Sequence, residues 1–137
     1  MKKILLLFFV VGFMFLFAND QGDKFCQVGD PDCDKYAAEI DENKEKFIIY
    51  AADACENKKD LSYCHNLGVY LTQNKLYKYA RDYYTIACDL DYGPSCYNLA
   101  YLEEFDEKIE LSRKYFQKAC DLGVKESCDE LKRLEND

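Results

Sequence analysis

The sequence predicts an all-α protein made of antiparallel helix pairs stacked side by side. Residues 64–68, Cys-His-Asn-Leu-Gly, recur 32 positions later at 96–100 as Cys-Tyr-Asn-Leu-Ala. In the same way, Ala-Cys-Asp-Leu at 87–90 recurs at 119–122, and Cys-Asp-Glu-Leu at 128–131 begins a further copy. A fixed period of about 20 to 50 residues is typical of stacked repeat proteins, and the apolar residues of each copy follow helical spacing rather than strand alternation.

The first eighteen residues differ from the rest of the chain. Lys2 and Lys3 precede an unbroken apolar run of fifteen residues, Ile4 to Ala18, which is short for a membrane span of about 20 residues. A basic start, a short apolar run and a small residue at its end are typical of a secretory signal peptide. We expect residues 1–18 to be removed after Ala18, giving a periplasmic or secreted protein; an uncleaved N-terminal anchor is the alternative.

The mature chain is predicted to be strongly acidic. Removal of Lys2 and Lys3 from the 18 basic residues leaves 16 against 26 acidic ones, a net charge near −10. Such a chain repels nucleic acids and anionic membrane surfaces. We therefore expect no nucleic-acid partner and no membrane association after the signal is removed.

The remainder divides into a lead-in and a repeat domain. Residues 19–32 are polar and contain Gly22, Gly29 and an Asp-Pro pair, so they are expected to be irregular. The repeat domain spans residues 33–137, in units of about 33–63, 64–95 and 96–127 followed by a capping helix at 128–137. A helical array needs such a cap, because its last helix must present a polar outer face.

The first unit is a divergent repeat, as a terminal repeat is expected to be. Tyr36, Ala37 and Ile40 share one helical face, and a polar turn follows at 41–43. Residues at spacings of three and four then predict a second helix with an apolar stripe of Phe47, Tyr50, Ala51, Ala54 and Cys55.

The second unit is the clearest. Asp60 or Ser62 can cap a helix that runs to about Gln73, and Asn74 suits the turn that follows. The next helix carries one apolar stripe at helical offsets, formed by Leu76, Tyr79, Ala80, Tyr83, Ile86, Ala87 and Leu90.

The third unit matches the second. Pro94 suits the start of a helix that runs to about Phe105. The second helix carries Leu111, Ser112, Tyr115, Phe116, Ala119 and Leu122 on one face. Gly123 can adopt the left-handed conformation that ends a helix. The last helix, from about Lys125, directs Leu131 and Leu134 inward.

Small residues recur at matched positions of the repeats. They are Ala37, Gly68 and Ala100 in the first helices, and Ala54, Ala87 and Ala119 before the later Cys. We expect them to let helix backbones approach closely while a neighbouring Tyr or Phe fills the space beside them.

The eight cysteines fall into four close pairs with separations of 7, 9, 8 and 8 residues: Cys26–Cys33, Cys55–Cys64, Cys88–Cys96 and Cys120–Cys128. Eight cysteines allow 105 pairings, so the spacing alone leaves others open. The repeat favours this pairing, because an antiparallel helix–turn–helix can bring the two residues within disulfide distance each time. A zinc site usually places two ligands two to four residues apart, and no two cysteines here are that close. We expect no metal and no cofactor.

Repeats that open one helix with Cys-Xaa-Asn-Leu-Gly/Ala and close the next with Tyr-Tyr/Phe and Ala-Cys-Asp-Leu resemble the Sel1-like repeat family. The motifs stand at residues 64–71, 83–90, 96–102 and 115–122, and the resemblance covers roughly residues 33–135. The cysteines between repeats make the chain similar to the exported, cysteine-rich Hcp-type branch of bacterial proteins. The resemblance implies a right-handed superhelix of antiparallel helix pairs, related to tetratricopeptide repeats, with one disulfide per repeat in the pairing above.

The chain departs from this family in the turn within each helix pair. Family repeats usually run about four residues longer, with a Gly-rich turn (compare typical periods), whereas here the turns are reduced to residues 72–75 and 104–107. Because the repeats are few, any concave surface is expected to be short.

The first functional hypothesis is a monomeric module that binds a peptide or protein segment on its concave face. The candidate binding residues lie on the first helix of each repeat, off the packing stripe: His65, Asn66, Val69, Tyr97, Asn98 and Tyr101. Asn66 and Asn98 occupy matched positions and could hold a ligand backbone through paired amide hydrogen bonds. The structural alternative is that both amides satisfy nearby helix ends or face water.

The second hypothesis is an enzyme, because the resembled family is described as penicillin-binding or weakly β-lactamase-active. The residues do not indicate a mechanism: a serine β-lactamase needs Ser with Lys three residues on, and no serine has one. His65 is the only histidine, too few for a zinc enzyme. A Ser62–His65 pair on one helix face could act as nucleophile and base, Tyr97 and Tyr101 could stack on a ligand ring, and Glu103 and Glu104 are expected on a solvated face. The catalytic residues are therefore unknown, and the ligand is either a polypeptide or a cell-wall or β-lactam compound.

Overall fold

A computed structural model describes residue 31 and residues 41–136 of the chain. The expected signal peptide, the lead-in apart from residue 31, the first helical face of the first unit and the Cys26–Cys33 bridge lie outside the described residues. The chain from Glu42 onward forms one compact unit.

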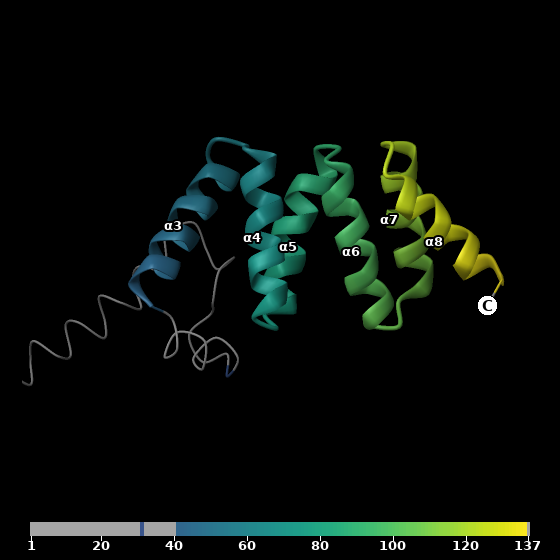
Figure 1. Ribbon diagram of the computed structural model, residues 1–137, viewed down its shortest axis with the longest axis horizontal. Helices are drawn as coiled ribbons and strands as arrows, with labels where there is room; N and C mark the ends of the chain where they lie inside the picture. The colour runs from purple at the N-terminus through teal and green to yellow at the C-terminus, as the bar shows by residue number, and fades with distance from the viewer. Residues whose placement is uncertain (1–30, 32–40, 137) are drawn as a thin grey trace, which may run out of the picture. The chain divides into compact units, whose positions relative to one another are not determined.

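The described residues form an all-α solenoid of antiparallel helices, as the sequence predicted (Figure 1). The six helices described are α3 (Glu42–Glu56), α4 (Leu61–Gln73), α5 (Tyr77–Asp89), α6 (Gly93–Phe105), α7 (Ile109–Asp121) and α8 (Lys125–Asn136). Each helix packs against the next along the chain, and α4 also contacts α6 across α5. Within this part of the chain, every helix falls short of the length and apolar content needed to cross a bilayer.

The turns repeat as faithfully as the helices. Between pairs, Lys59, Asp91 and Gly123 adopt positive φ values of 55°, 64° and 92°. Within pairs, Lys75 and Glu107 do so at 64° and 62°. Each set recurs at the 32-residue period. The left-handed conformation costs about 1 kcal/mol for a residue with a side chain. Because it recurs at matched positions despite this cost, the same kind of short connection joins each pair of consecutive helices.

The apolar stripe of α5 forms the centre of the core. Leu76, Tyr79, Ala80, Tyr83 and Ala87 are buried, as predicted, and Ile86 is half-buried. The prediction was wrong for Leu90, which is 49% exposed because it lies at the C-cap, past the last helical turn that packs on a neighbour. Tyr84, outside the predicted stripe, is also buried, since α5 is covered on two sides by α4 and α6.

The stripe of α3 differs from the prediction at two positions, Ile48 and Tyr50. Tyr50 is 52% exposed, whereas Ile48 is buried together with Ala51, Ala54 and Cys55. The Tyr50 ring instead packs edge-on against Tyr63 at the rim of the helix pair.

The end of the array is closed by α7 and α8. Ala100, Phe116 and Leu134 form a buried apolar cluster, with the half-buried Tyr97, Tyr115 and Leu131 packed against it. Leu111 is half-buried, Ser112 and Ala119 are buried, and Leu122 is 39% exposed at the C-cap of α7, where the predicted stripe ends too late.

Gly68 confirms the prediction that small residues permit close helix contact. A Cβ at this position would lie 2.5 Å from the ring of Tyr84. The Tyr84 ring therefore occupies the space that any larger residue at position 68 would need. Ala54, Ala87, Ala100 and Ala119 are likewise buried.

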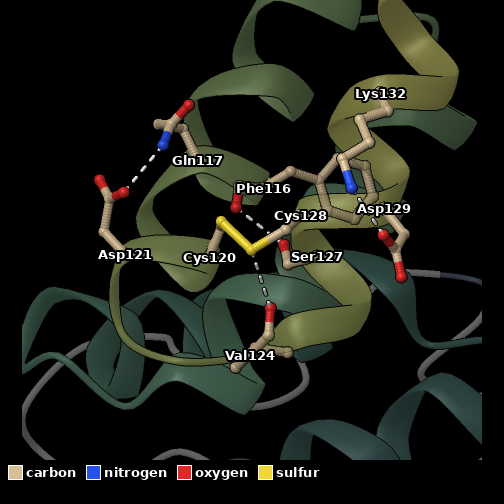
Figure 2. The surroundings of a disulfide bond; sticks show 9 residues. All are labelled: Phe116, Gln117, Cys120, Asp121, Val124, Ser127, Cys128, Asp129 and Lys132. Atoms are coloured by element: carbon tan, nitrogen blue, oxygen red, sulfur yellow. Dashed lines mark hydrogen bonds and ion pairs between the residues drawn. A yellow bond between two sulfur atoms is a disulfide. The ribbon is translucent and has the colours of Figure 1, made fainter.

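Three disulfides link successive helix pairs: Cys55–Cys64, Cys88–Cys96 and Cys120–Cys128, with Cα–Cα distances of 4.7, 4.7 and 4.9 Å. These are the partners favoured by the repeat. Disulfides persist in oxidising compartments. The first two are fully buried, whereas Cys120 at the end of α7 and Cys128 near the start of α8 are half-buried. Figure 2 shows this last bridge, beside which the Ser127 hydroxyl donates to the Phe116 carbonyl at 2.8 Å.

Glu103 does not lie on a solvated face, contrary to the prediction; it is 2% exposed. Nε of Arg81 donates to Oε1 of Glu103 at 2.6 Å, and Nζ of Lys108 lies 3.3 Å from Oε2. The Arg81 guanidinium also reaches the Asp106 carboxylate and the Leu102 carbonyl. Burial is possible because the charge is paired. The second helix of one repeat is thereby tied to the first helix of the next.

Candidate functional site

The six candidate binding residues lie on α4 and α6, the first helices of their repeats, in different environments. His65 is half-buried between helices, the two asparagines differ from each other, and the two tyrosines form an aromatic cluster. Val69 is half-buried. The six residues therefore do not form one continuous site.

His65 is part of an interhelical contact. Its Nδ1 lies 3.0 Å from Oγ of Ser95, and its ring packs at 5.8 and 5.5 Å from the rings of Tyr84 and Tyr92. The Ser62–His65 pair that the sequence suggests as a nucleophile and base does not form, because the Ser62 hydroxyl donates to Asp60 at the N-cap of α4. Ser95, the actual partner, is completely buried. An attacking hydroxyl must reach a substrate carbon, so this pair does not have the geometry of a nucleophile and its base.

The environment of His65 predicts a pH-dependent stability. Burial lowers the pKa of its imidazole below the ordinary value of 6.5. As pH falls below 6.5, the unfolded chain binds a proton before the folded protein does, so the free energy of unfolding decreases over that interval. We expect His65→Gln to lose less stability than the original chain between pH 7 and pH 5, measured by urea unfolding at both values. Identical pH dependence would contradict this.

Asn66 and Asn98 do not form a matched pair of ligand amides. Asn98 is half-buried and its Nδ2 donates to the Tyr84 hydroxyl at 3.2 Å, whereas Asn66 is exposed. The difference follows from the preceding helix. Asn98 on α6 meets the hydroxyl of Tyr84 on α5, whereas the matching position on α3, four residues before Cys55, is Ala51, which carries no hydroxyl. Asn98 therefore serves to satisfy a buried tyrosine rather than a helix end.

Tyr97 and Tyr101 form an aromatic cluster with Phe116. The two hydroxyls lie 3.2 Å apart, and the rings of Tyr101 and Phe116 meet edge to face at 5.1 Å. Burial, the Tyr97 hydroxyl and a hydrogen bond with the Glu130 carboxylate all raise the pKa of Tyr101. Tyr101 remains 38% exposed, so one side of its ring is available to a ligand.

Tyr101 lines an open groove with a volume of about 400 Å³. The groove is lined by Tyr77 at the start of α5 and by Tyr101, Leu102, Glu104 and Phe105 in the second half of α6. The Tyr77 and Phe105 rings lie 5.5 Å apart, and Phe105 is 71% exposed. We refer to these five residues as the α5–α6 groove. Pockets of this size accommodate side chains and small ligands.

An ion-pair chain borders the groove on the side of α8. Arg133 donates to both carboxylate oxygens of Glu104, at 2.7 and 2.8 Å, and to Glu130 at 2.6 Å. The hydrogen bond and proximity of Arg133 hold the pKa of Glu130 below its usual range. Glu104 is thus held in place at the edge of the groove by the last helix.

Of the groove residues, sequence reasoning identified only Tyr101. Phe105 lies in an acidic run, Glu103 to Glu107, where a large apolar residue is unusual. This position in the sequence was a signal that could have identified Phe105 as a candidate. Tyr77 is separated from Phe105 by 28 positions, so the contact depends on how the helix pairs stack. Among the described residues, no three His, Cys, Asp or Glu side chains gather closely enough to hold a metal ion.

Comparison of the chain with protein-family models, with curated proteins and with solved structures finds no match.

Proposed function

We propose that this protein is an exported, disulfide-linked Sel1-like repeat protein that binds a peptide or protein segment in the α5–α6 groove. The observation that carries the proposal is the exposed aromatic wall of that groove. Phe105 is 71% exposed, although its neighbour Leu102 is buried and Tyr77 lies against it. Exposed aromatic side chains that gather at a concave site are typical of interaction surfaces.

Export is part of the proposal. Three disulfides within residues 41–136 favour an oxidising compartment. The basic and apolar residues 1–18 have the composition of a secretory signal. Together they support a periplasmic or secreted location for the mature chain.

Hydrolysis of β-lactams rests on the family resemblance alone. Ser95 is buried, the Ser62 hydroxyl donates to the N-cap residue Asp60, and no serine is followed by Lys three residues on. We therefore place peptide binding first and treat hydrolysis as the outcome that would overturn it.

Selection of peptides from a random display library against the oxidised chain tests the proposal. We expect selected peptides to bind Phe105→Ser at least about tenfold more weakly than the original chain, because a central aromatic contact is lost. Leu90→Ser is the matched control, since Leu90 is 49% exposed at the opposite end of α5; it should leave affinity within about twofold.

The proposal fails if no peptide is selected, or if both substitutions weaken binding equally. The same preparations should be assayed with a chromogenic cephalosporin. Turnover that disappears in His65→Ala would establish the enzyme instead.

A further inference from the structure

We propose that the α5–α6 groove recognises the positively charged side chain of a lysine or arginine in the bound segment. The inference rests on the proposed function and adds the chemistry of the ligand. It follows from three aromatic rings, one carboxylate and an unbalanced local charge that meet at this groove.

The rings provide a surface suited to a cation. Tyr77, Tyr101 and Phe105 all line the groove, and the Tyr77 and Phe105 rings are inclined at 43° with their centres 5.5 Å apart. The face of an aromatic ring carries partial negative charge, and it attracts an ammonium or guanidinium group within about 6 Å of its centre. Several rings around one open space are the arrangement that binds organic cations.

The repeat architecture does not require these aromatic residues. In the preceding repeat, the positions that match Tyr101 and Phe105 hold Val69 and Gln73, and the helix there packs in the same way. Phe105 is 71% exposed, so it contributes little to the core. Tyr101 also packs on Phe116, but core packing does not account for the exposed ring of Phe105, and this favours a ligand as its reason.

Charge favours a cation over a neutral apolar side chain. Glu104 lines the groove, and it shares the single guanidinium of Arg133 with Glu130, so this group of three charged side chains, all among the described residues, has one negative charge in excess. The nearby Lys108 is engaged with Glu103 and Asp106, and the ammonium of Lys78 lies over the Tyr79 ring at 5.4 Å. A purely apolar ligand would cover the Glu104 carboxylate without compensating it, which is unfavourable.

The test uses three pentapeptides, Gly-Ser-Xaa-Ser-Gly with blocked ends, in which Xaa is lysine, arginine or norleucine. Binding to the oxidised full chain is followed by the amide chemical shifts in NMR titrations. We expect saturable shifts at Tyr77, Glu104 and Phe105 with the lysine and arginine peptides, and affinity for norleucine at least about threefold weaker.

Two pairs of variants separate the contributions. Tyr77→Leu and Phe105→Leu keep the wall apolar but remove the rings, and each should weaken lysine binding by about threefold. Glu104→Gln and Arg133→Gln both break the same ion pair between α6 and α8. If the ion pair mattered only for the structure, both substitutions would change the affinity for the lysine peptide in the same direction. Electrostatic recognition instead predicts weaker binding for Glu104→Gln and tighter binding for Arg133→Gln, each by about threefold.

Any one of four results would overturn the inference. The lysine and arginine peptides do not bind, or the norleucine peptide binds as tightly as they do. Alternatively, the leucine variants keep their affinity for lysine, or the two glutamine variants change that affinity in the same direction. If library peptides still require Phe105 but contain no essential lysine or arginine, the proposed function stands and the cation is wrong.

Discussion

Replacing Cys88 and Cys96 together with alanine should lower the free energy of unfolding by about 2 to 4 kcal/mol. The bridge closes a loop of eight positions between α5 and α6 and so restricts the unfolded chain. Both cysteines are completely buried, so the substitution also leaves unfilled space between the two helices. Urea unfolding of the oxidised protein, followed by far-ultraviolet circular dichroism, measures the effect.

The matched control is the Cys120→Ala and Cys128→Ala pair. Its loop has the same length, but both cysteines are half-buried and the bridge holds only the terminal helix α8. We expect a loss smaller by about 1 kcal/mol, because less packing is removed. Two results together would show that the central bridge does not form. They are unchanged stability of the variant that lacks Cys88 and Cys96, and free thiols at these positions in the original chain.

Arg81→Met should destabilise the protein by about 3 kcal/mol. The substitution leaves the Glu103 carboxylate, with 3% of its side chain exposed, facing only Lys108 at 3.3 Å. An ionised group left without its main partner in the interior is strongly destabilising. The hydrogen bond from Arg81 to the Leu102 carbonyl is lost as well. Chemical unfolding at neutral pH provides the measurement.

A second substitution tests whether the buried charge of Glu103 causes the loss of stability in Arg81→Met. Glu103 occupies the position that Leu71 holds in the preceding repeat, where the residue is buried and apolar. Arg81→Met combined with Glu103→Leu should therefore recover most of the lost stability, since no charge remains buried. Arg113→Met serves as the control, because Arg113 occupies the position of Arg81 in the following repeat. Its guanidinium lies 3.8 Å from the exposed Glu110 carboxylate and donates to the Leu134 carbonyl. Failure of the double substitution to recover stability would contradict a charge-burial effect.

The sequence by itself determined the class of fold, the period of the array and the small residues of the helix contacts, and its repeat favoured the disulfide partners found within residues 41–136. These features are local. A stripe at spacings of three and four predicts a helix, as in Leu76 to Ala87, and two cysteines eight positions apart across a short turn have few other partners within reach. Gly68 was predictable for the same reason, since its place in the repeat identifies a helix contact.

Only the tertiary structure decided which polar residues are buried and which aromatic residues are exposed. Glu103 and Arg81 are 22 positions apart, His65 and Ser95 are 30 apart, and Tyr77 and Phe105 are 28 apart. Each contact joins one helix pair to the next, so it depends on the angle and depth at which neighbouring pairs pack. Helical periodicity specifies the face of a residue on its own helix, but it carries no information on what the adjacent repeat places opposite that face. The buried ion pair and the α5–α6 groove arise at such junctions between repeats.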